Sequence, residues 1–143
     1  MRWRLLLVTS LVLFLFSAIR TVADVKPKYF IRLYSDICFH AESGDLLGTR
    51  IIVLRLRDGD YVYFQSAEDS PSSAKAIIAD NATDIEFHII EPDRPAIDFK
   101  GKLTDQLLSG RMEYDDGKGN KWLGDPMRLP RLDNVQKGFL TCK

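Results

Sequence analysis

The stretch 97-IDFKGKLTDQLLSGRMEY-114 separates its apolar and polar side chains completely when it is folded back on itself with Asp105 and Gln106 at the turn. One face then holds the pairs Ile97–Tyr114, Phe99–Met112, Gly101–Gly110 and Leu103–Leu108. The opposite face holds Asp98, Lys100, Lys102, Ser109, Arg111 and Glu113. Because side chains alternate between the two faces of a strand, this division predicts an antiparallel hairpin with one buried face and one wet face.

The two glycines of this stretch allow a second interpretation, since glycine-rich loops also cradle phosphates. In the hairpin, however, Gly101 and Gly110 lie opposite each other on the core face, one pair beyond Leu103 and Leu108. The missing side chains there leave room for a bulky neighbour from a facing strand, or let the sheet bend sharply. The sequence therefore predicts that this stretch is architecture and not a ligand loop.

A second hairpin is predicted for 50-RIIVLRLRDGDYVYFQ-65, where Asp58-Gly59 is typical of a type I′ turn. That turn pairs Leu56 with Tyr61, Leu54 with Tyr63 and Ile52 with Gln65 on a face free of charge. We expect this uncharged face to be the core face.

The other face of the same hairpin mixes apolar and cationic side chains, a composition typical of interface centres. We expect it to be a partner-binding face made of Ile51, Val53, Arg55, Arg57, Val62 and Phe64. The alternative is that another segment, for example residues 29–34, covers this cluster as a second core layer.

Further strands follow from the same alternation. In residues 74–90, a loop at 80–83 places Ala76, Ile78, Ile85, Phe87 and Ile89 on one face. Residues 28–34 favour a strand, with a short helix as the alternative, and one more short strand is expected around Trp122 or Met127. The sum is an all-β chain with little helix: an antiparallel meander of about 7–9 strands that forms a small barrel or a two-sheet sandwich.

The N-terminal residues predict export. Arg2 and Arg4 precede an apolar run, Leu5 to Ile19, which is shorter than the roughly 20 residues of a membrane span. Small residues before position 24 suit signal peptidase, so we predict a signal peptide over 1–23, cleaved after Ala23, and a single β domain over 24–143. The mature chain would carry no membrane span and would be periplasmic or extracellular; a retained anchor is the alternative.

Charge argues against nucleic acid as a partner. Residues 1–23 contain three of the 20 basic residues and none of the 20 acidic ones, so the mature chain has 17 basic and 20 acidic residues. Binding to nucleic acid usually calls for a basic stripe or patch, which this balance does not favour.

The cysteine pair fits an oxidising compartment. Cys38 and Cys142 are the only cysteines, and an exported chain favours a disulfide between them, with a buried free thiol as the alternative. Such a bridge would tie the start of the domain to its end. The flanking segments around Cys38 and Cys142 would then be neighbours.

No motif predicts catalysis, a cofactor or a metal site. His40 and His88 lie in different segments, and no nucleophile elbow, zinc-protease helix or phosphate loop is present. The acidic turn at 115–120 lacks calcium-loop spacing, because Pro126 takes the place of the final glutamate. Asn81 starts an N-glycosylation sequon, which matters only in a eukaryotic source.

These observations predict a function by elimination. We expect an exported, non-enzymatic β domain that binds a macromolecular partner, such as an exported protein or enzyme; an inhibitor-like or immunity-like role would fit. The alternative is a carrier of a small apolar ligand, which requires a barrel cavity of several hundred Å³. A hydrolase with an unfamiliar constellation of residues is a third hypothesis.

Overall fold

A computed structural model describes residues 29–67, 69–132 and 140–142; the predicted signal peptide lies outside these residues. The described residues form twelve β-strands and no helix. The strands are β1 (Phe30–Ser35), β2 (Cys38–Phe39), β3 (Leu46–Leu47), β4 (Thr49–Leu56), β5 (Gly59–Ser66), β6 (Ser72–Ile78), β7 (Asp84–Ile89), β8 (Ala96–Leu103), β9 (Leu107–Asp115), β10 (Lys121–Leu123), β11 (Met127–Pro130) and β12 (Leu140–Thr141).

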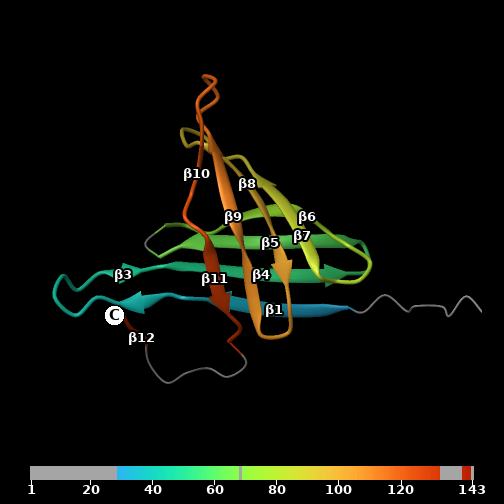
Figure 1. Cartoon of the computed structure of the whole chain (residues 1–143), viewed down its shortest axis with the longest axis horizontal. Helices are drawn as coiled ribbons and strands as arrows, with labels where there is room; N and C mark the ends of the chain where they lie inside the picture. Colours follow the sequence, from blue (N-terminus) through green and yellow to red (C-terminus); the bar gives the residue numbers. More distant parts are fainter. Residues whose placement is uncertain (1–28, 68, 133–139, 143) are drawn as a thin grey trace, which may run out of the picture.

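Nine strands form one antiparallel sheet, which confirms the predicted fold class. Its order is β1-β4-β5-β6-β7-β8-β9-β10, and β11 pairs with the free half of β9. The sheet curls over so that β8, β9 and β11 cross β1, β4 and β5 at a steep angle (Figure 1). The result is a half-barrel with one enclosed face and one outer face.

The β8–β9 hairpin has the predicted register. Phe99 pairs with Met112, and Gly101 pairs with Gly110. In the β6–β7 hairpin, Ile78 pairs with Ile85, as the predicted loop requires. Every apolar residue assigned to the core from these two alternations, other than the partly buried Ile97 and Tyr114, is buried.

The β4–β5 hairpin differs from its prediction in register. Leu56 pairs with Gly59 and Val53 with Val62, so that Arg57 and Asp58 form the turn in place of Asp58-Gly59. This shift moves the pairing by two positions, and an even shift leaves the composition of each face unchanged.

The core face of this hairpin is also the opposite of the one predicted. Ile51, Val53 and Val62 are fully buried, whereas the uncharged face lies outside. The charges that argued against burial neutralise each other, since Arg55 pairs across the strands with Asp60 at an Nε–Oδ1 distance of 3.6 Å. The Arg55 guanidinium also donates to the carbonyls of Ile78 and Ala79 at the end of β6.

The core face of this hairpin is covered by β8, β9 and β11, which belong to the other half of the curled sheet. The buried cluster joins Ile51 and Val53 of β4 to Phe99 of β8, Leu108 of β9 and Leu129 of β11. The segment at residues 29–34 is not a second layer; β1 extends the same sheet beside β4.

Polar contacts join β1 to the β8–β9 turn. Arg32, which is buried, pairs with Asp105, and the Tyr34 hydroxyl donates to the Thr104 carbonyl at 2.6 Å. Burial raises the pKa of Tyr34, so its hydroxyl stays protonated and donates this bond. A bridge between Tyr34 and Arg131 connects the two edges of the curled sheet at this end.

A small second sheet holds the cysteines. β12 pairs with β2 in parallel, placing Leu140 beside Cys38, and β2 pairs with β3. Cys38 and Cys142 form the predicted disulfide pair, with their Cα atoms 5.0 Å apart. The expected closeness of the two flanking segments is confirmed.

Candidate functional site

The structure separates the six residues predicted to bind a partner. Ile51, Val53 and Val62 are 0% exposed, so the expectation that they form a surface is corrected: they are core residues. Phe64 is half-buried and lines a cavity, described below. The two arginines have different environments: Arg55 pairs with Asp60, whereas Arg57 lies exposed in the turn.

The opposite side of the same strands carries an unexpected apolar surface. We define the outer apolar face as the seven outward side chains Ile31, Leu33, Ile52, Leu54, Leu56, Tyr61 and Tyr63. Strand pairing makes this face continuous, since Ile31 lies beside Leu54 and Leu54 beside Tyr61. The second row runs parallel to it, from Leu33 through Ile52 to Tyr63.

Several members of the outer apolar face are well exposed. Ile31 is 65% exposed, Tyr63 46% and Leu56 39%. None of the seven carries a charge; Arg50 and Gln65 border them at one end, and Lys75 borders them on β6. Contiguous apolar surface of this kind is uncommon on soluble proteins and is typical of interaction sites.

A cavity of about 330 Å³ opens at one end of the half-barrel. We call it the mouth cavity. One wall is apolar and comes mainly from the inward side chains Phe64, Ile97, Met112, Tyr114 and Met127, with Trp122 at the edge. The other wall is polar. It comes from the strand-end residues Thr49, Ser66 and Ser72 and from Asp69, Ser70, Glu91 and Arg94 in the β5–β6 and β7–β8 connections.

Two contacts shape the mouth cavity. Tyr114 and Trp122 stack with ring centroids 5.5 Å apart and an angle of 12° between the planes. Across the polar wall, Arg94 Nη2 donates to Asp69 Oδ1 at 2.8 Å and links the β5–β6 and β7–β8 connections. The hydrogen bond from Arg94 lowers the pKa of Asp69, so this carboxylate stays charged at a lower pH than an ordinary aspartate.

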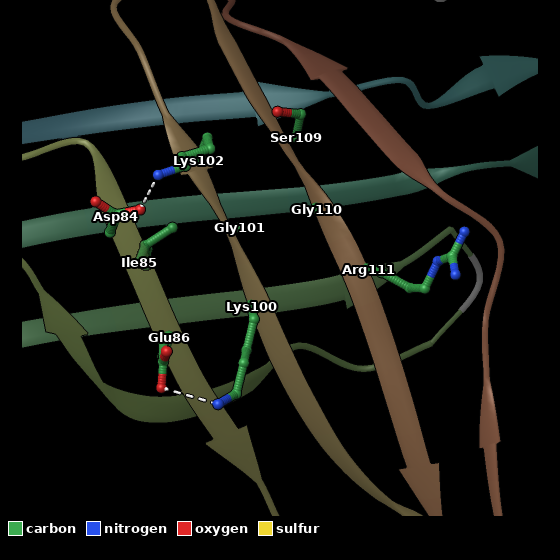
Figure 2. A pocket seen from close by; sticks show the side chains of 9 residues that line it. All are labelled: Asp84, Ile85, Glu86, Lys100, Gly101, Lys102, Ser109, Gly110 and Arg111. Atoms are coloured by element: carbon green, nitrogen blue, oxygen red, sulfur yellow. Dashed lines mark hydrogen bonds and ion pairs between the residues drawn. The ribbon is translucent and has the colours of Figure 1, made fainter.

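A shallow depression of about 470 Å³ lies over the two facing glycines on β7, β8 and β9. Figure 2 shows Lys102 reaching Asp84 and Lys100 reaching Glu86, while Arg111 points away from Lys100. The neighbouring strand β7 therefore supplies Glu86, which offsets the unfavourable Lys100–Arg111 pair. Exposed ion pairs of this kind are typical of an ordinary solvated sheet face.

Each of the two histidines contacts one polar side chain close to it in the sheet or turn. His40 Nδ1 lies 3.1 Å from the Ser43 hydroxyl, and His88 Nδ1 lies 2.7 Å from Asp98. Within residues 29–67, 69–132 and 140–142, no three acidic, histidine or cysteine side chains are grouped as metal ligands would be. No helix in this part of the chain could span a bilayer.

Comparison of the chain with protein-family models, with curated proteins and with solved structures found no match.

Proposed function

We propose that this chain is an exported, non-enzymatic β domain that binds another exported protein through its outer apolar face. The observation that carries the proposal is the continuity of seven uncharged, largely apolar side chains across β1, β4 and β5. In an antiparallel sheet with one solvated side, polar residues normally occupy these positions.

The chemistry of the outer apolar face suits a protein partner. Tyr61 and Tyr63 offer flat apolar rings with a polar tip, which is the amphipathic type of side chain enriched at the centres of interfaces. Leucine and isoleucine side chains surround them, and the bordering Arg50 and Lys75 can form a polar rim. The expected partner therefore presents an apolar patch with acidic residues at its edge.

Two observations support export. The apolar run that ends at Ile19 follows two arginines, as in a signal peptide. The pairing of Cys38 with Cys142 fits an oxidising compartment.

The proposal is tested by affinity capture from the exported fraction of the source cells. The bait is the wild-type domain, compared with the double variant Leu54→Ser/Tyr63→Ser. The control is Lys100→Ser/Arg111→Ser, which changes the outer surface of β8 and β9 and leaves the outer apolar face intact. Circular dichroism first establishes that all three baits are folded.

One protein captured by the wild type and the control but lost with Leu54→Ser/Tyr63→Ser would support the proposal. Capture of the same proteins by all three baits would contradict it. Light scattering on the purified domain gives its mass, and a dimer that the face variant abolishes would reassign this face to self-association.

The mouth cavity favours a second candidate function, small-ligand binding. Its volume falls within the range expected for a barrel carrier, but half of its wall is polar, so the wholly apolar ligand of the sequence-based alternative does not suit it.

A further inference from the structure

The apolar wall of the mouth cavity presents aromatic surface to any occupant. Phe64, Tyr114 and Trp122 belong to three different strands, and all three line the cavity. Trp122 remains 45% exposed although it stacks on Tyr114, so the indole keeps surface available to a ligand. Aromatic rings attract cations, and tryptophan does so most strongly.

The polar wall is negatively charged. Among the described residues that line the cavity, the charged ones are Asp69, Glu91 and Arg94, and none of these lining residues is a lysine. Asp69 is held by Arg94 in a short hydrogen bond, whereas Glu91 Oε2 lies 3.5 Å from Arg94 Nη1. Glu91 therefore forms the longer of the two ion pairs with the Arg94 guanidinium. Its side chain, at 24% exposure, is the most buried of the three charged side chains.

From these two walls we propose that the mouth cavity binds a small organic cation carrying an apolar ring or chain. The cationic group lies between the Glu91 carboxylate and the aromatic rings. The apolar part lies against Ile97, Met112 and Met127 on the inner wall. The serine and threonine hydroxyls on the opposite side supply hydrogen bonds for an ammonium group.

This site is independent of the proposed partner-binding face. The mouth cavity and the outer apolar face share no residue, because their side chains project from opposite faces of the sheet. Failure of either proposal leaves the other standing.

The sequence provides a built-in reporter for the test. Trp3 lies in the predicted signal peptide, so Trp122 is the single tryptophan of the chain 24–143. We would titrate this oxidised chain with benzyltrimethylammonium and follow its fluorescence. Benzyl alcohol serves as the neutral comparison and phenylacetate as the anionic one.

We expect a saturable change in Trp122 fluorescence with the cation, weaker binding of benzyl alcohol and the weakest binding of phenylacetate. No saturable change with the cation would overturn the proposal. Binding of phenylacetate as tight as that of the cation would overturn it equally, since the charge of the wall would then not select the ligand.

Variants locate the site. Glu91→Gln keeps the shape of the side chain and removes its charge, and we expect it to weaken binding of the cation roughly 3- to 30-fold. Glu86→Gln removes a carboxylate from the outer face of β7, outside the cavity, and should leave binding unchanged. Equal affinities of the two variants would contradict the proposed site. Trp122→Ala, measured by calorimetry because the reporter is lost, should weaken binding by a similar factor.

Discussion

Gly101 and Gly110 form a pair at which a side chain would collide with its surroundings. A Cβ atom at Gly110 would lie 2.5 Å from Phe99 Cζ, and one at Gly101 would lie 2.6 Å from the same atom. Phe99 in turn stacks on Phe87, with ring centroids 4.7 Å apart. The bulky neighbour predicted for the glycines therefore exists, but it comes from β8 itself and not from a facing strand.

We predict that Gly110→Ala lowers the free energy of unfolding by about 2 kcal/mol, and Gly110→Val by more, because the Phe99 ring and the Lys100 carbonyl both block the new atoms. Ser109→Ala is the control: it lies on the outer side of the same strand and should change the unfolding free energy by less than about 0.5 kcal/mol. Urea denaturation measures all three. A Gly110→Ala variant as stable as Ser109→Ala would contradict the packing described here.

At the scale of the element, the β4–β5 hairpin shows what alternation can and cannot predict. Its alternation assigned the residues to the two observed faces correctly, because a register shift of two positions leaves every side chain on the same face. The alternation could not predict which face is buried, because the charges of Arg55 and Asp60 argue against burial of the face that carries them. Their mutual pairing depends on the observed register, which differs from the predicted one. The carbonyls that accept from Arg55 lie at the end of β6, outside the hairpin sequence.

Neighbouring substitutions test this face assignment. We predict that Val62→Ser costs about 2–4 kcal/mol of stability, because it removes buried apolar atoms and buries a hydroxyl. Tyr63→Ser, one residue further on, should cost less than about 1 kcal/mol, since Tyr63 lies on the outer apolar face. Thermal or urea unfolding compares them, and a reversed order of the two costs would restore the sequence-based assignment of the core.

At the scale of the whole molecule, the sequence predicted the fold class, two of the three registers and the disulfide partners. It did not predict the outer apolar face as a surface or the mouth cavity. The cavity joins residues from the β5–β6 and β7–β8 connections to side chains of β5, β8, β9, β10 and β11. Which of these segments meet depends on how far the sheet curls, and no local pattern encodes that curvature.

The disulfide is predicted to stabilise the whole domain. Cys38 and Cys142 are separated by 104 positions, so their bond restricts most of the unfolded chain. We expect Cys38→Ser to lower the melting temperature by roughly 15 °C, from a chain-entropy contribution of about 4 kcal/mol. The reduced wild type is the control and should melt near the variant. An unchanged melting temperature would remove the bridge from the account of stability.

The central claim is that the outer apolar face binds a partner, and site-specific photocrosslinking in the exported fraction tests it most directly. A photoreactive phenylalanine analogue replaces Tyr63 on the outer apolar face in one chain and Lys100 on the outer side of β8 in another. We predict a discrete adduct with one exported protein from position 63 and none from position 100. The absence of an adduct from position 63, or the same adduct from both positions, would contradict the claim.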